Sequence, residues 1–165
     1  YFGLAMYSDD GGVSWTQSSG IGSVGLDDVC YINNSQTVIA ITETAIYRSV
    51  DGGVNYSITD NTFNTQYVSI SGDGKGIILT NSTNPPYYTT TNAGLNWLAG
   101  PVSTSATAYN DVVVFDSTLI LATKMSGIVY STNMGQSWNS TDISKEMYEI
   151  NRTDHTSRYA FVLGK

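Results

Sequence analysis

Short apolar runs, each about the length of one β-strand, recur along the chain and are separated by polar turns. The runs fall into groups of three, and they lie at 29–32, 37–41 and 45–47, at 68–70, 76–79 and 87–89, at 112–115, 119–122 and 128–130, and at 147–150, 159–163 and 4–7. No stretch sustains the 3.6-residue apolar period of a helix. The pattern therefore predicts an all-β chain with almost no helix.

An eight-residue phrase follows every group of runs, and its copies occupy 8–15, 49–56, 90–97 and 131–138, with starts 41 residues apart. Its third position is Asp10, Asp51, Asn92 or Asn133, its fifth is Gly12, Gly53, Gly94 or Gly135, and its eighth is Trp15, Tyr56, Trp97 or Trp138. The third residue can accept backbone N–H bonds, the glycine permits a positive φ, and the aromatic ring can pack under the loop. The phrase therefore predicts a tight turn that leads into a fourth strand.

Three runs, the phrase and a fourth strand take up about 41 residues, which is the size of one propeller blade. From the last phrase through the C-terminus to the first phrase is a similar distance, so four copies account for all 165 residues. We expect one domain over 1–165, a four-bladed β-propeller of four-stranded antiparallel blades.

The two chain ends fall between the second and third strands of the fourth blade. We therefore expect this blade to be shared, with two strands from the C-terminal end and two from the N-terminal end. Closure of the ring by one chain is the favoured arrangement. The alternatives are donation of half a blade to a neighbour, which would give a head-to-tail polymer, continuation in a tandem polyprotein, and two chains pooled into one eight-bladed ring.

The pattern Ser/Thr-x-Asp-x-Gly-x-x-Trp resembles the Asp-box, or BNR repeat, of sialidases, sortilin-type receptors, some glucan hydrolases and photosystem II assembly factors. The copy at 8–15 is nearest to that pattern, while the copies at 90–97 and 131–138 have Asn for Asp and the copy at 49–56 has Tyr for Trp. The resemblance implies a folding element on the outer edge of each blade, away from any active site.

A sialidase-like activity is the obvious enzyme hypothesis, and the resemblance would then require three convergent arginines and a Tyr–Glu pair. The chain has only Arg48, Arg152 and Arg158, of which the first directly precedes a box and the other two share one hairpin. The Phe/Tyr-Arg-Ile-Pro motif expected near the start is absent. We therefore expect no catalytic residues and no enzyme, and glycoside hydrolysis is the least favoured function.

Charged residues make up only 13% of the chain, the net charge is -7, and 40 residues are Ser or Thr. The seven cations are scattered singly, so no basic patch for nucleic acid or anionic lipid is expected. No apolar run reaches membrane-spanning length. This composition is typical of a secreted or cell-surface β protein.

Carboxylates near the starts of the inner strands could form an oxygen-ligand ring for Ca²⁺ in a central channel, namely Asp27, Asp28, Asp111 and Glu149. The second blade offers only Gln66 and Tyr67 there, so solvated strand ends are the favoured interpretation and no metal or cofactor is predicted. The lone His155 is expected in a surface turn, and Cys30 is expected to act as a small buried apolar residue.

The acceptor pattern Asn-x-Ser/Thr for N-linked glycans occurs at Asn33, Asn55, Asn81, Asn139 and Asn151. Asn33 and Asn151 are expected in equivalent turns after a first strand, and Asn81 in the loop before two prolines. Simple turn asparagines are the alternative. The favoured function is a non-catalytic, secreted, glycosylated and self-associating subunit of an extracellular fibre or sheath. A carbohydrate- or peptide-binding propeller of a surface receptor or adhesin is the alternative.

Overall fold

A computed structural model describes residues 3–33, 35–62, 64–82, 84–101, 109–152 and 159–164. In these residues every regular element is a β-strand, and all strand pairing within the sheets is antiparallel. The prediction of an all-β chain is therefore confirmed.

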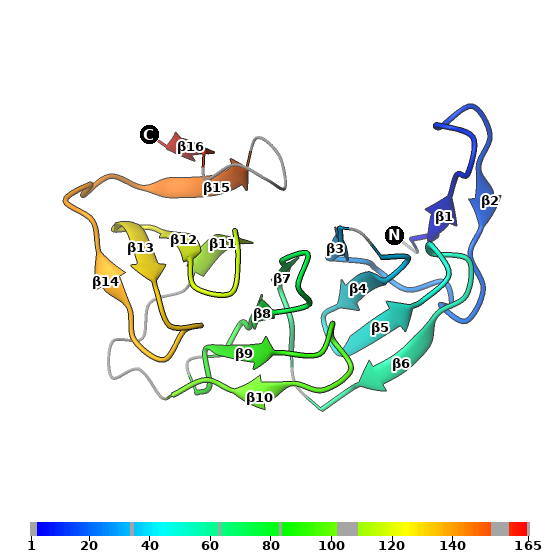
Figure 1. The fold of residues 1–165 in the computed structure, drawn as a ribbon, viewed down its shortest axis with the longest axis horizontal. Helices are drawn as coiled ribbons and strands as arrows, with labels where there is room; N and C mark the ends of the chain where they lie inside the picture. Colours follow the sequence, from blue (N-terminus) through cyan, green and yellow to red (C-terminus); the bar gives the residue numbers. More distant parts are fainter. Residues whose placement is uncertain are drawn as a thin grey trace.

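Three four-stranded sheets form the middle of the molecule, and we call them blades A, B and C (Figure 1). Blade A consists of β3 (Asp28–Tyr31), β4 (Val38–Thr42), β5 (Ala45–Ser49) and β6 (Ser57–Asp60). Blade B consists of β7 (Tyr67–Ile70), β8 (Gly76–Leu79), β9 (Tyr87–Thr90) and β10 (Leu98–Ala99). Blade C consists of β11 (Tyr109–Val114), β12 (Ile120–Lys124), β13 (Gly127–Ser131) and β14 (Asn139–Ser140).

A two-stranded sheet flanks the blades at each end of the chain. The N-terminal hairpin pairs β1 (Met6–Tyr7) with β2 (Thr16–Gln17), and the C-terminal hairpin pairs β15 (Met147–Arg152) with β16 (Ala160–Gly164). Figure 1 shows the sheets following one another along an open arc, with these hairpins at its two ends. The first strands β3, β7, β11 and β15 contact one another in sequence along the inner side.

The apolar core lies between consecutive sheets. Each of the three interior contacts joins branched or aromatic side chains of one sheet to those of the next, and the clusters are Ile39, Ile41 and Ile46 with Val68, Ile70 and Ile78; Ile77, Leu79 and Tyr87 with Val112, Val114 and Ile120; and Leu119 and Leu121 with Ile150 and Val162. Blades B and C therefore bury both of their faces, one against the preceding sheet and one against the following sheet, as blades of a propeller do.

The structure does not confirm a fourth, shared blade. The N-terminal and C-terminal hairpins form separate sheets with no pairing between them, and they lie at opposite ends of the arc (Figure 1). Sheets that pack through full layers of large side chains lie nearly face to face, about 10 Å apart. In the described residues the three blades and the two hairpins form an open arc (Figure 1).

Candidate functional site

The four Asp-box turns share one hydrogen-bond network. In each turn the third residue accepts the backbone N–H of the seventh, at 2.9 Å in all four copies, and the pairs are Asp10 with Ser14, Asp51 with Asn55, Asn92 with Asn96 and Asn133 with Ser137. In each turn the first residue accepts the N–H of the glycine with its hydroxyl, at 2.8–3.1 Å. Asn therefore replaces Asp without loss of the acceptor, as the sequence pattern predicted.

The two boxes with Asp also hold a stabilised negative charge. Hydrogen bonds from the Ser14 side chain and backbone lower the pKa of Asp10 to about 2. The backbone and side-chain N–H groups of Asn55 lower the pKa of Asp51 to about 2 in the same way. Both carboxylates are thus ionised throughout the physiological range.

One feature of the boxes was not evident from the sequence. The fourth position has a positive φ in every copy, including the two where it is not glycine, with φ of 56° at Ala93 and 55° at Met134. A side chain is tolerated there only at some conformational cost, which the rest of the turn must offset.

Each complete blade's box is held by the preceding sheet. The side chain of Ser18 donates to the carbonyl of Gly53 at 2.6 Å, and Arg48 Nε donates to the carbonyl of Ala93 at 2.9 Å. The Tyr87 hydroxyl donates to the carbonyl of Gly135. The boxes therefore connect blades as well as closing hairpins, which is a structural role for Arg48 that the sequence did not reveal.

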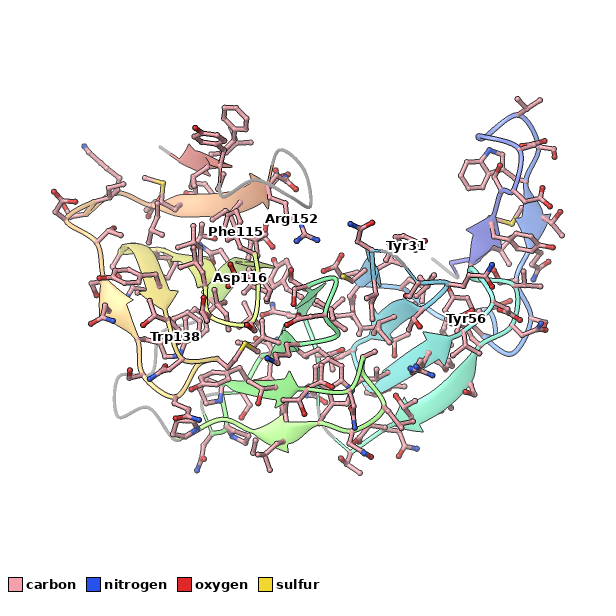
Figure 2. All side chains as sticks on the ribbon, viewed as in Figure 1. Tyr31, Tyr56, Phe115, Asp116, Trp138 and Arg152 are labelled. Carbon is pink, nitrogen blue, oxygen red and sulfur yellow. The ribbon has the colours of Figure 1, made fainter. Side chains whose placement is uncertain are left out.

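The inner side of the arc encloses a cavity of about 490 Å³, bordered by β3, β7, β11 and β15. Figure 2 shows Tyr31 and Arg152 on this concave side, from different ends of the arc, and both line the cavity. Arg152 Nη1 donates to the carbonyl of Val114 at 2.9 Å. Arg48 lies elsewhere, at a box, so these two arginines do not converge; Arg158 lies outside the described residues.

The inner carboxylates tie neighbouring blades together. Asp28 Oδ2 accepts the N–H of Val68, and Asp111 Oδ2 accepts the N–H of Ile150, both at 2.9 Å. Burial is the main cause that raises the pKa of Asp28 and of Asp111 above the usual range, and the backbone N–H bonds oppose it in part. These side chains are therefore inter-blade acceptors rather than the free, solvated strand ends that we expected.

The other residues singled out near the channel have separate surroundings. Glu149 accepts a bond from Asn151 Nδ2 at 2.6 Å, and burial raises the pKa of Asp27. Cys30 is partly buried, its Sγ accepts the N–H of Ile70 at 3.3 Å, and burial raises the pKa of its thiol. Within the described ranges no three His, Cys, Asp or Glu side chains are placed to share a metal ion. His155 lies outside those ranges.

The glycan acceptor patterns occupy different settings. Asn81, Asn55 and Asn139 are exposed, the last of these on β14, and Asn33 is partly buried in the turn after β3. Asn151 is exposed but lies within β15 and borders the inner cavity. Its expected position in a turn is therefore wrong, because β15 runs two residues further than its apolar run.

The ends of the arc carry exposed apolar side chains. On β16, Phe161 is 72% exposed and Leu163 is 63% exposed, whereas Ile39 and Ile41 on β4, the second strand of blade A, are 0% exposed. At the other end a groove of about 570 Å³ lies between the N-terminal hairpin and blade A. Its lining includes Met6, Tyr7, Trp15, Val29 and Tyr31.

The profile of the BNR/Asp-box repeat family matches residues 6–17, which cover the N-terminal hairpin and its turn. The recognition of an Asp-box from the sequence is thus confirmed. No curated protein sequence matches this chain. In the described residues, no helix is long and apolar enough to cross a membrane.

The chain is similar in fold to several solved structures. YCF48 bound to D1 peptide has a TM-score of 0.63 at 16% identity, over 79% of this chain and 44% of that one. An ancestral GH74 enzyme has a TM-score of 0.65 at 18% identity, over 88% of this chain and 22% of that one. A variant of the NanB sialidase from Streptococcus pneumoniae has a TM-score of 0.60 at 15% identity, over 96% and 32%. At such identities the likeness shows the fold alone. It is a BNR-type β-propeller architecture, and the chain spans less than half the length of each of these proteins.

Proposed function

We propose that this chain is a non-catalytic structural and interaction propeller that works outside the cell. In this proposal it is a glycosylated repeating subunit of an extracellular fibre or sheath, and it assembles through the two ends of its arc. Its boxes and inner strands provide rigidity, and its ends provide the contacts.

The exposure of Phe161 and Leu163 carries the proposal. Contiguous apolar side chains on a soluble domain mark a surface that another polypeptide covers. At the other end of the arc, the groove lined by Met6, Val29 and Tyr31 is a second surface of the same character. A protein with one apolar surface at each end is suited to linear association.

The inter-blade bonds support a mechanical role. Box carbonyls are bonded to Ser18, Arg48 and Tyr87 of the preceding sheet, and Asp28 and Asp111 bond the inner strands to the next one. These bonds span the whole arc from rim to inner side, so the sheets resist displacement relative to one another.

Sedimentation velocity over a concentration series, followed by negative-stain electron microscopy, tests the assembly. We expect species that grow with concentration and appear as linear or closed assemblies of arcs. A population that remains monomeric at every concentration would contradict the proposed function.

The glycan part of the proposal has its own measurement. Asn81 and Asn139 are exposed, and glycans there would add bulk and solubility to a surface with few charges. Intact mass of protein secreted by eukaryotic cells should exceed the polypeptide mass and return to it after enzymatic removal of N-linked glycans. An unmodified mass would remove the glycoprotein assignment.

A peptide- or glycan-binding propeller is the second candidate, and the inner cavity of about 490 Å³ favours it. Tyr31 is exposed at this cavity and offers a ring face for stacking. Binding on a glycan or peptide array that is lost in Tyr31→Ala would favour this function over a purely structural one.

A further inference from the structure

Consecutive sheets use the same strand positions for their contacts. In each following first strand the residue that pairs with Ile78, Ala122 or Val162 is covered by the preceding sheet. Its exposure is 6% for Val68, 5% for Val112 and 3% for Ile150. Val29 holds the corresponding position in β3, because it pairs with Ala40 as Val68 pairs with Ile78. The N-terminal hairpin precedes blade A and supplies Ala5 against Ala40, Ala45 and Tyr47. Within the described residues this hairpin has no strand that corresponds to β4 or β8, and Val29 is 61% exposed.

The side chains of a second strand that cover the next blade are buried in blade A, but the equivalent side chains of β16 are exposed. Ile39 and Ile41 of β4 pack over Val68 and Ile70 of the next blade. Their counterparts on β16 are Phe161 and Leu163, because Ile150 pairs with Val162 as Val29 pairs with Ala40. The C-terminal hairpin therefore presents an unused covering face, and β3 presents an unused face to be covered.

The complete blades also fix the register that β16 would adopt with a third strand. Val162 corresponds to Ala40, Ile78 and Ala122, and the third-strand partners of those residues are Tyr47, Tyr88 and Val129. All three partners lie two residues before the first residue of an Asp-box. In β1 that position is Met6, and all three blades therefore give the same register.

We infer that β16 of one copy pairs antiparallel with β1 of a second copy, with Val162 opposite Met6 and Phe161 opposite Tyr7. The new sheet has the strand order β15-β16-β1-β2, and Phe161 and Leu163 cover Val29 and Tyr31 of the second copy. This inference rests on the proposed function and names the partner and the contact through which the assembly forms.

A second copy fits better than the same chain. The two hairpins lie at opposite ends of one arc (Figure 1), so their edges do not meet within one molecule. The groove beside the N-terminal hairpin is bordered by both halves of the inferred contact, Met6 and Tyr7 on one side and Val29 and Tyr31 on the other. In the contact between blades A and B the corresponding place is filled by the first two strands of blade A, β3 and β4, and Ile39 and Ile41 of β4 cover Val68.

Disulfide trapping between two different variants tests the register. Phe161→Cys and Tyr7→Cys are made as separate proteins in a Cys30→Ser background, mixed and oxidised. Directly opposed residues have Cβ atoms roughly 4.5–5.5 Å apart, within reach of a disulfide. We expect a cross-linked pair that contains one copy of each variant. The matched control mixes Phe161→Cys with Met6→Cys, which is shifted by one residue and points to the other face, and should give little product.

A charge on the covered face tests the packing without disturbing the fold. Val29→Asp should weaken association by about tenfold or more, because the carboxylate would be buried against Phe161 and Leu163. Val50→Asp is the control, since Val50 is equally exposed but lies in the turn of the second Asp-box, and it should associate like the unmodified protein.

The results distinguish a failure of the β16–β1 contact from a failure of the proposed function. If Val29→Asp does not change association and the two cysteine mixtures cross-link equally, the β16–β1 contact is wrong. The protein would still assemble, so the proposed function would stand. A cross-linked monomer from one chain that carries both Phe161→Cys and Tyr7→Cys overturns the second copy in favour of ring closure. An absence of association under all conditions contradicts the proposed function itself.

Discussion

The hydroxyl of Tyr87 tests whether the Asp-boxes connect neighbouring blades. The Tyr87 ring is fully buried, and its hydroxyl donates across the blade boundary to the carbonyl of Gly135, in the turn of the fourth box. The ring itself meets Trp138 edge-on, with centroids 5.7 Å apart and an interplanar angle of 70°. Tyr87→Phe keeps this ring contact and removes only the donor.

The expected change in the free energy of unfolding follows from the loss of the bond to the buried Gly135 carbonyl. Loss of a partner from a buried polar group costs about 1–3 kcal/mol, and at this chain length about 1 kcal/mol corresponds to roughly 2–4 °C in Tm. We therefore expect Tyr87→Phe to lower the free energy of unfolding by about 1–3 kcal/mol in a urea titration. Tyr159→Phe is the control, because that ring is exposed, and it should change stability by less than about 0.5 kcal/mol. Equal stabilities for the two variants would refute the box-to-blade connection.

Three further substitutions are expected to change stability, each measured by urea or thermal unfolding. Gly94→Ala should destabilise the fold more than Gly12→Ala, because both glycines have a positive φ but only a Cβ at Gly94 would come within 2.6 Å of the Ile39 δ-methyl; equal losses would remove the blade contact from the explanation. Thr123→Val should stabilise by about 1 kcal/mol, because the buried Thr123 hydroxyl has no partner among the described residues, and a loss of stability would show that it is bonded. Asp28→Asn should gain stability relative to the unmodified protein as pH rises from below 3.8 to neutral, because burial raises the folded pKa of Asp28 above 3.8 and the contribution of the protonated carboxyl is lost as pH rises through that pKa; a stability difference that stays constant with pH would contradict this sign.

The repeated turn is the part of the fold that the sequence predicts best. Its chemistry is local, since Asp10 or Asn92 needs only an N–H four residues away, and the ends of the predicted apolar runs agree with the observed strands to within three residues. The predicted run at 76–79 coincides with β8, and the run at 45–47 is extended only to Ser49.

Whether the blades close into a ring could not be predicted in the same way. It depends on the angle between sheets, which is set by the combined volume of residues such as Ile77, Tyr87 and Val112 rather than by any local pattern. A repeat count gives the number of sheets but not the rotation between them. The expected sharing of the fourth blade within one chain is not confirmed for this reason.

Asp28 and Arg48 were singled out from the sequence, but their inter-blade roles were not, because both act on groups far away along the chain. Asp28 accepts an N–H from Val68, 40 residues later, and Arg48 donates to Ala93, 45 residues later. Both partners are backbone groups, so no pattern of side chains in the sequence predicts the contact. The distance of about one repeat is the only signal available, and it becomes meaningful once consecutive sheets are known to lie face to face.

Hydrogen exchange at β16 tests most directly whether the free edge of the C-terminal hairpin is a pairing surface. The amides of Ala160–Gly164 lie on a strand that has only one neighbour in the isolated chain, whereas β4 and β12 have neighbours on both sides. As concentration rises and copies associate, we expect exchange across Ala160–Gly164 to slow toward the rate of β4, while the outer strand β6 stays unchanged. Association that leaves Ala160–Gly164 exchanging as fast as in the dilute protein would contradict the account.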